Sequence, residues 1–357
     1  MVQTNPRENL RRLLDGGVPD WIPFTLDIGA MPGLTEPIRQ TFRATTGADD
    51  PAEYFDTDIR RFSLKATFGG IDPAALHDTL PNGTEFDEWG NGHWAGGAEG
   101  TVDELFPALA SAQTVQDVEA LPLPKIETDV DTSVIDAYHQ AGYPVFGYAG
   151  SIYEWSWWVR GMEQFWVDLL SDVPLAEAII EKITAHTTQL AIASARIGID
   201  VLCFYDDAGM QQGMQIAPDL WRRMIKPAWQ RVLDAVRCEA PDARFFLHSC
   251  GKIDPIVPDI VELGFHILHP VQPECMDFAR LYREYGKDIV LAASLSSQRL
   301  LPFGTPEDVR REVFRLAEVV GSDRRCLLMP SNAIQPETPR ANVVALVDAA
   351  RSLRPSG

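Results

Sequence analysis

Basic side chains are scarce in this sequence and form no cluster. Its 357 residues include 31 Lys and Arg against 51 Asp and Glu, so the formal net charge is −20. A protein that binds nucleic acid through the phosphates needs a concentrated basic surface. We therefore expect no nucleic-acid partner, and the excess of negative charge favours a soluble protein.

Long apolar runs and regularly spaced cysteines are missing as well. No apolar stretch comes near the roughly 20 residues that span a bilayer, and the start of the chain has no apolar core of a signal peptide. The five cysteines are odd in number and irregularly spaced, which is typical of reduced thiols rather than of a disulfide framework. We expect a cytoplasmic protein that does not enter a membrane.

What the chain does contain is an alternation of strand-length apolar runs with helix-length segments. The clearest helix is predicted over 175–197, where apolar residues recur at steps of three and four and Gly198 follows as a stop signal. Eight strands that alternate with helices predict one α/β domain over residues 1–357, a single (β/α)8 TIM barrel. The predicted strands cover 21–27, 57–62, 144–150, 201–207, 243–251, 266–272, 289–295 and 326–331.

The N-terminal third is predicted to carry loop and hairpin insertions into this barrel. Residues 29–50 are rich in Pro, Gly and Thr and predict a long loop. Residues 83–97 predict a β-hairpin at the barrel rim, because large side chains alternate around the turn-forming pair Asn91-Gly92. This hairpin and the Trp-rich stretch 153–166 are candidates for the contact of a homodimer.

The stretch 244–251, Arg-Phe-Phe-Leu-His-Ser-Cys-Gly, carries the strongest chemical signal. An apolar strand ends there in His248 and Cys250, and side chains two apart on a strand point the same way, roughly 6 to 7 Å apart. One metal ion can bridge that span, with an imidazole and a thiolate as ligands. The pattern also fits a buried thiol beside a hydrogen-bonded histidine, and spacing alone does not decide between the two.

Further reactive side chains follow the predicted strands, where the active sites of barrels lie. Asp206 and Asp207 close the strand 201–207. Each carboxylate is a potential metal ligand, imidazole partner or general base, unless the pair caps a helix. Glu154 lies among aromatic residues, where burial would make it an acid unless it faces solvent. The predicted substrate-binding residues are Asp27, Tyr148, Trp155, Tyr205, Gln272 and Asn332.

With these residues placed, the sequence resembles the uroporphyrinogen decarboxylase superfamily over nearly its whole length. The resemblance implies a (β/α)8 barrel with a deep pocket. True porphyrinogen decarboxylases carry an arginine-rich loop near the N-terminus, and residues 29–33 here contain no arginine, so another branch is favoured. The matching segments are PRENL at 6–10, DWIP at 20–23, RGME at 160–163, FYDD at 204–207, MIKP at 224–227, HSCG at 248–251, VQP at 271–273 and IQPETP at 334–339.

The favoured branch transfers methyl groups between corrinoids and thiols, or demethylates small molecules with partner proteins. The resemblance implies that His248 and Cys250 are two ligands of a zinc ion, and that a corrinoid is carried by a partner protein. Members of the branch usually have a Cys or His where this chain has Asn332. We therefore expect His269 to supply the third ligand, with Asp207 as the alternative.

The expected function is that of a zinc-dependent methyl or alkyl transferase acting on a thiol or a methylated small molecule. Asp206, Asp207 and Glu154 are its predicted catalytic residues. One alternative is a decarboxylase or lyase of a small or tetrapyrrole acid, with Arg60 or Arg160 holding the acid group. Another is a non-catalytic barrel that binds a corrinoid or tetrapyrrole.

Overall fold

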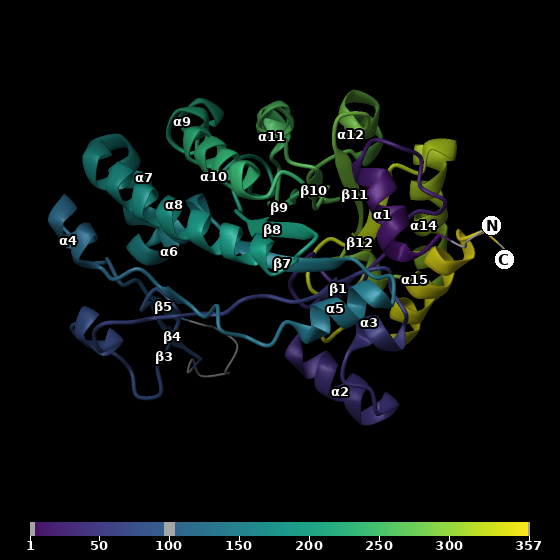
Figure 1. Cartoon of the computed structure of the whole chain (residues 1–357), viewed down its shortest axis with the longest axis horizontal. Helices are drawn as coiled ribbons and strands as arrows, with labels where there is room; N and C mark the ends of the chain where they lie inside the picture. Colours follow the sequence, from purple (N-terminus) through teal and green to yellow (C-terminus); the bar gives the residue numbers. More distant parts are fainter. Residues whose placement is uncertain (1–3, 96–103, 356–357) are drawn as a thin grey trace.

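A curled sheet of parallel strands forms the centre of the computed structural model, which describes residues 4–95 and 104–355 (Figure 1). Neighbours in the order β1-β7-β8-β9-β10-β11-β12 are hydrogen-bonded, and each pairing is parallel. The carboxyl ends of all these strands therefore meet at one mouth. The strands are β1 (Arg60–Arg61), β7 (Val145–Gly150), β8 (Val201–Tyr205), β9 (Arg244–His248), β10 (Ile267–His269), β11 (Val290–Leu295) and β12 (Cys326–Pro330).

Residues 23–25 close this sheet into a barrel. On one side, the N–H of Leu328 in β12 donates to the Pro23 carbonyl and the Thr25 N–H donates to the Leu328 carbonyl. On the other side, the Asp58 N–H, just before β1, donates to the Phe24 carbonyl. The predicted strand 21–27 is thus present as a single bridge at Phe24, because Pro23 has no N–H to extend the ladder. The predicted barrel fold is confirmed.

Helices cover the outside of the barrel (Figure 1). The predicted helix 175–197 is α8 (Val173–Arg196), whose apolar stripe is buried against the sheet. The helices are α1 (Pro6–Leu14), α2 (Glu36–Thr46), α3 (Pro51–Tyr54), α4 (Val115–Ala120), α5 (Ser133–Gln140), α6 (Tyr153–Arg160), α7 (Met162–Ser171), α8, α9 (Pro218–Met224), α10 (Lys226–Glu239), α11 (Val257–Leu263), α12 (Phe278–Tyr285), α13 (Leu300–Phe303), α14 (Pro306–Val320) and α15 (Arg340–Ser352), with 3-10 turns η1 (Pro73–Leu76), η2 (Asp254–Ile256) and η3 (Gly321–Asp323).

Two predicted segments differ from the structure. The single helix expected over 218–238 is divided into α9 and α10, because Pro227 in the first turn of α10 has no N–H with which α9 could continue. The loop expected over 29–50 contains the helix α2, which buries Phe42 and ends at Gly47 with a left-handed φ of 72°. Its Pro37 lies in the first turn, where proline costs no hydrogen bond.

The hairpin insertion forms a small antiparallel sheet of β3 (Glu85–Phe86), β4 (Gly92–Trp94) and β5 (Glu104–Phe106). The predicted turn at Asn91-Gly92 is wrong, since the chain turns over residues 87–91. The Asp87 carboxylate accepts the N–H groups of Trp89 and Asn91 and so holds that turn. Residues 96 and 97 of the predicted hairpin lie outside the described residues. A second antiparallel pair, β2 (Ala66–Thr67) with β6 (Lys125–Ile126), connects this region to the barrel.

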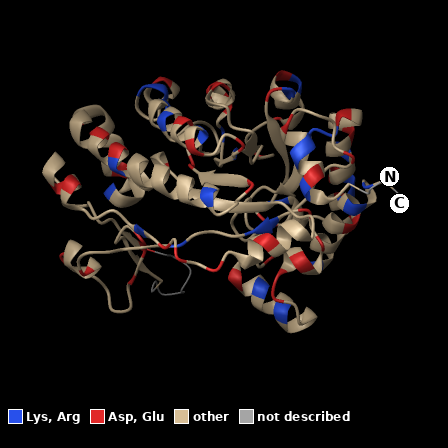
Figure 2. Ribbon diagram, in the orientation of Figure 1, with Lys and Arg blue, Asp and Glu red and all other residues tan. Residues whose placement is uncertain are grey.

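Acidic and basic segments are intermixed on the outer helices (Figure 2). Each helix in the described part of the chain is too short or too polar to cross a membrane. The interior of the barrel is filled with side chains such as Phe146, Phe246 and Met329, all fully buried. Binding and chemistry are therefore restricted to the mouth and the outer surface.

Candidate metal centre at the barrel mouth

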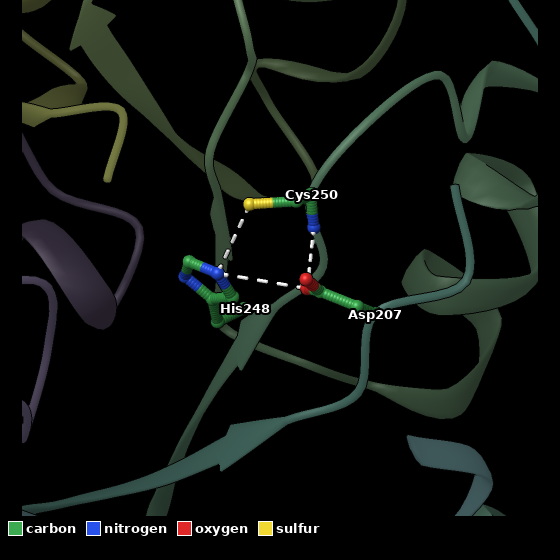
Figure 3. Close-up of side chains that lie close together, drawn as sticks. All are labelled: Asp207, His248 and Cys250. Carbon is green, nitrogen blue, oxygen red and sulfur yellow. Dashed lines mark hydrogen bonds and ion pairs between the residues drawn. The ribbon is translucent and has the colours of Figure 1, made fainter. Parts of the chain in front are cut away.

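Three potential metal ligands converge where β8 and β9 end (Figure 3). The Sγ atom of Cys250 lies 3.2 Å from Nε2 of His248, and that nitrogen lies 3.6 Å from Oδ1 of Asp207. One ligand atom from each residue lies within 4.8 Å of the other two. The positive φ of Gly251, 84°, turns the chain immediately after Cys250. A side chain at Gly251 would collide with the backbone of Gly209, so the turn requires glycine.

His269 lies behind His248 and determines which nitrogen of that ring is free. Nε2 of His269 is 2.9 Å from the Pro330 carbonyl, so this nitrogen carries a proton and donates it. Nδ1 of His269 is then an acceptor, and it receives the Nδ1–H of His248 at 2.8 Å. The lone pair of His248 is left on Nε2, facing Cys250 and Asp207. A hydrogen bond at the far nitrogen is the usual way in which a metal-binding histidine is oriented.

This arrangement uses both nitrogens of His269, which is completely buried. The geometry therefore does not support His269 as the third ligand and gives it a positioning role instead. Burial lowers the pKa of His248 to about 4, so its ring is neutral near pH 7 and able to ligate. Asp207, the alternative, is the residue that the fold brings to the other two.

The Cys250 thiol is held by two neighbours. Its proton can be donated to Nε2 of His248 across their short contact, and a metal ion would replace that proton. The Nδ2 group of Asn332 lies 3.4 Å from the sulfur and donates to it. Burial, with the charge of Asp207, raises the pKa of the Cys250 thiol, while the Asn332 contact opposes this rise. Asn332 is thus placed to stabilise a thiolate.

Asp207 and Glu154 form a linked pair of carboxyl groups beside the thiol. Oδ1 of Asp207 accepts the Cys250 N–H at 2.7 Å, and Oε2 of Glu154 accepts the Asp207 N–H at 3.2 Å. Burial and then the charge of Asp207 raise the pKa of Glu154 well above its ordinary value. Burial also raises the pKa of Asp207. Glu154 is therefore suited to hold a proton near pH 7, as an acid would.

Asp206 is buried and both of its carboxylate oxygens accept hydrogen bonds from the protein, which does not support the catalytic role expected for it. Its Oδ1 accepts the Ser151 hydroxyl and the N–H groups of Ile152 and Glu154, and its Oδ2 accepts the Trp229 indole N–H at 2.8 Å. These bonds connect the end of β8 to the start of α6. Asp206 thus anchors the helix that carries Glu154.

Three predicted substrate-binding residues hold loops at the mouth. The Tyr205 hydroxyl donates to the Ile28 carbonyl at 2.5 Å and accepts the N–H groups of residues 30 and 31. Asp27 pairs with Arg61 at 2.7 Å and accepts the N–H of residue 33. Gln272 accepts the Gly251 N–H at 2.8 Å. The polar atoms of Tyr205 and Asp27 are occupied by the protein, so the structure gives these two positioning roles, whereas Gln272 holds the turn through Oε1 and also lines the pocket at the mouth.

Tyr148 and Trp155 belong to a row of ring contacts that begins at the metal ligands. Tyr205 lies 5.2 Å from His248 between ring centroids, and Tyr148 lies 5.6 Å from Tyr205. Trp155 follows at 5.8 Å and contacts Trp89 of the hairpin insertion at 5.6 Å. Trp155 is only 7% exposed, so it packs the core beneath the insertion. Tyr148 remains partly exposed beside Glu154.

A pocket of about 370 Å³ opens directly beside Cys250 and Asp207. Residues 209–211, Ser297 and Gln298 line it, and none of them is among the residues predicted from the sequence. They follow the predicted strands 201–207 and 289–295 by a few positions, and this nearness to the strand ends is the signal in the sequence that marks them. The other lining residues are Gly251, Gln272, Ser331 and Asn332.

The two arginines proposed to hold a substrate acid are occupied. Arg60 donates to the carbonyls of Thr57 and Ile59, and Arg160 pairs with Asp168 at 2.7 Å. Both arginines are 4% exposed. The structure therefore does not support the form of the decarboxylase alternative in which Arg60 or Arg160 holds the acid group of the substrate.

The imidazole, thiol and carboxylate at the mouth fit a zinc ion by donor chemistry, since these are the three kinds of side chain that bind zinc. His248 is neutral with its free lone pair toward the other donors. The set leaves a fourth position for a substrate, as catalytic zinc sites do.

Comparison with known proteins gives the same superfamily. The family model described as uroporphyrinogen decarboxylase (URO-D) matches residues 101–353. The methylcobamide:CoM methyltransferase MtaA of Methanosarcina barkeri is 29% identical over 175 residues, which are 48% of this chain and 48% of that protein. The uroporphyrinogen decarboxylase of Geobacter sp. (strain M21) is 24% identical over 257 residues, 68% of this chain and 71% of that protein. The aligned segment thus spans about half the length of the methyltransferase relative.

A solved methyltransferase from Methanosarcina mazei shares the fold with a TM-score of 0.69. The two chains are 18% identical, and the match covers 98% of this chain and 99% of that one. These relatives are enzymes, methyltransferases and a decarboxylase, as the sequence analysis expected of the superfamily.

Proposed function

The chain belongs to the uroporphyrinogen decarboxylase (URO-D) family, and on that premise we propose that it is a zinc-dependent methyl or alkyl transferase. One observation carries the proposal: the free Nε2 of His248, the Cys250 sulfur and the Asp207 carboxylate converge within ligand reach of one another. His248, Cys250 and Asp207 would hold the zinc ion. When bound, zinc would lower the pKa of a substrate thiol so that it reacts as a thiolate at neutral pH.

The neighbouring residues would orient these groups and hold a proton beside them. His269 keeps the His248 lone pair on Nε2, and Gln272 fixes the turn after Cys250. Glu154, with its raised pKa, would hold a proton at the mouth, and the proton of the substrate thiol would leave to solvent as its sulfur accepts the methyl group. Asp206 would act only through the position of α6.

We further propose a corrinoid bound to a partner protein as the source of the methyl group. The support is the MtaA relative, whose name gives methylcobamide as a substrate of that protein. A small molecule would enter the pocket beside Cys250 as the second substrate.

Metal content tests the proposal. The parent and Cys250→Ala, both purified without a metal-binding tag, are compared by mass spectrometry for metal per chain. About one zinc per parent chain and none in the variant is the expected result. Cys238→Ala is the matched control, because Cys238 is an exposed thiol on α10, and it should retain the metal.

Activity is then measured as alkylation of a small thiol by a methylated corrinoid, with the zinc-loaded parent and the same variants. A parent that holds no metal, or a Cys250→Ala variant as active as the parent, would contradict the proposal. Carbon dioxide release from a carboxylic acid that persists after chelation would instead favour a decarboxylase.

A further inference from the structure

Two glutamine side chains meet at the rim of the pocket beside Cys250. Gln211 follows β8 and Gln298 follows β11, and both residues line the pocket. The Nε2 group of Gln211 donates to Oε1 of Gln298 at 3.4 Å. Oε1 of Gln211 accepts the thiol proton of Cys275, whose sulfur lies 3.3 Å away. The amide of Gln211 is thus held at both of its polar atoms.

The order of the strands shows what this contact spans. β9 and β10 separate β8 from β11 in the sheet (Figure 1), and neighbouring strands lie about 4.8 Å apart, so β8 and β11 end roughly 14 Å apart along the sheet. Cys250 follows β9 and Gln272 follows β10, and both line the pocket between. Gln272 is buried, whereas Gln211 and Gln298 are exposed. The Gln211–Gln298 contact therefore forms an amide bar on the solvent side of the pocket.

The backbone that carries Gln211 is fixed, so the amide bar can open without movement of the loop. Residues 208–215 form a small hairpin, closed by backbone hydrogen bonds of 2.7 and 2.8 Å. The Lys252 N–H donates to the Met210 carbonyl at 2.8 Å and joins this hairpin to the turn after Cys250. The two bonds of the Gln211 side chain are longer, neutral and near solvent, and each such bond contributes little. Rotation of one side chain is therefore enough to open the bar.

We propose that Gln211 controls access to this pocket: its side chain closes the rim when bonded to Gln298, and a small molecule enters as that bond breaks. In the methyl transfer proposed above, closure behind the substrate would keep water from the reacting thiol. Only this consequence rests on the proposed function. Access to the pocket does not depend on metal and is tested without it.

The test compares how fast a small and a bulky reagent reach Cys250. N-methylmaleimide and N-(1-pyrenyl)maleimide are both uncharged and add to thiols by the same reaction. Their rates in the chelator-treated full chain are followed by mass spectrometry of the peptide that contains Cys250. The ratio of the bulky to the small rate reports access, because a change in the reactivity of the thiol affects both rates. Cys238, an exposed thiol on α10, gives the reference ratio in the same sample.

All variants carry Cys275→Ser, which removes a second thiol beside the bar and keeps a hydroxyl that can donate to Gln211. Gln211→Ala should raise the ratio at Cys250 about twofold to tenfold, the factor by which one hydrogen bond of this kind favours the closed state. The matched control is Gln212→Ala, since Gln212 is exposed and is not among the residues that line the pocket. Its ratio should equal that of the parent.

Two substitutions of Gln298 should act in opposite directions. Gln298→Ala removes the acceptor and should raise the ratio as Gln211→Ala does, and the double variant should show little further rise, because both changes break the same bond. Gln298→Glu supplies a carboxylate, which forms a stronger, charge-assisted hydrogen bond with the Gln211 amide. The ratio should then fall at least about twofold.

Several results would overturn the proposal. They are an unchanged ratio in Gln211→Ala, an equal rise in Gln212→Ala, a rise in Gln298→Glu, and a Cys250 that neither reagent reaches in any variant. The two proposals fail independently. A ratio that responds to Gln211 in a protein that binds no metal would establish the amide bar and refute the zinc-dependent transferase. Metal binding with a ratio that does not respond to Gln211 would leave the transferase in place and refute the bar.

Discussion

The positioning role of His269 can be tested by replacing that residue with leucine. In the structure the Nδ1–H of His248 has one acceptor, Nδ1 of His269 at 2.8 Å. His269→Leu removes this acceptor inside a completely buried environment. An unsatisfied buried donor costs about 1–3 kcal/mol, and the ring can avoid that cost by moving its proton to Nε2. The nitrogen that faces Cys250 and Asp207 would then be unable to bind metal.

We therefore expect His269→Leu to weaken zinc binding about 10- to 100-fold, the usual effect of removing a hydrogen-bond partner of a metal-binding histidine. This corresponds to about 1.4–2.7 kcal/mol of binding free energy. The assay is a zinc titration in competition with a chromophoric chelator. Cys250→Ala, which removes a ligand, should lose far more affinity than His269→Leu.

Two further variants test whether the hydrogen bond between His248 and His269 is what supports zinc binding. His269→Gln should recover much of the affinity, because its amide can accept from His248 and donate to the Pro330 carbonyl. His186→Leu replaces another completely buried histidine, which lies on α8 and makes its ring contacts with Trp89 and Trp155, and should bind zinc like the parent. Parent affinity in His269→Leu would refute the role of the hydrogen bond. A loss as complete as that of Cys250→Ala would show that His269 is a ligand after all.

Three other predictions follow from the structure. Asp207→Asn should lower zinc affinity at least about tenfold in the zinc titration, since an amide is a weak zinc ligand. Asp206→Asn should instead lower the free energy of unfolding by about 2 kcal/mol in urea denaturation, because its amide N–H would face the Trp229 indole N–H. The amount of metal per folded chain should stay unchanged in Asp206→Asn. Burial lowers the pKa of His186 to about 4, below the usual value of about 6.5, so its contribution to stability is present above pH 6.5 and lost as the pH falls toward 4. At pH 5 this loss amounts to about 2 kcal/mol of the free energy of unfolding. Neither ring nitrogen of His186 has a hydrogen-bond partner, so His186→Leu should make the urea midpoint depend less on pH. An unchanged dependence would contradict the lowered pKa of His186. Gly251→Ala should lower the free energy of unfolding by about 1–3 kcal/mol and reduce metal binding, because its Cβ would lie 2.5 Å from the Gly209 backbone carbon at a φ of 84°. Gly47 has a similar φ and open space around it. Gly47→Ala should therefore lower the free energy of unfolding less in the same denaturation assay and leave metal binding unchanged.

The barrel could be predicted because each strand carries its own signal. Segments such as 245–247 and 326–330 are buried on both faces, so they are continuously apolar, and helices of fitting length separate them. The error in the hairpin arose because a nearby side chain competed with the predicted turn signal. The Asn91-Gly92 pair is a turn signal, but the Asp87 carboxylate binds the N–H groups of residues 89 and 91 and so places the turn over residues 87–91, with Gly92 already in β4.

The sequence by itself determined that a buried strand ends at His248 with Cys250 two residues further on, because a continuous apolar run followed by a glycine marks a buried strand and its turn whatever surrounds them. Only the tertiary structure decided the rest of the site. Asp206 and Asp207 are neighbours in the chain, and contacts with Trp229 and with Cys250, each from another element, separate their roles. His269 became a partner of His248 because β9 and β10 place the two residues in register. Such pairings depend on which strands and helices meet, and no local pattern in the chain encodes that.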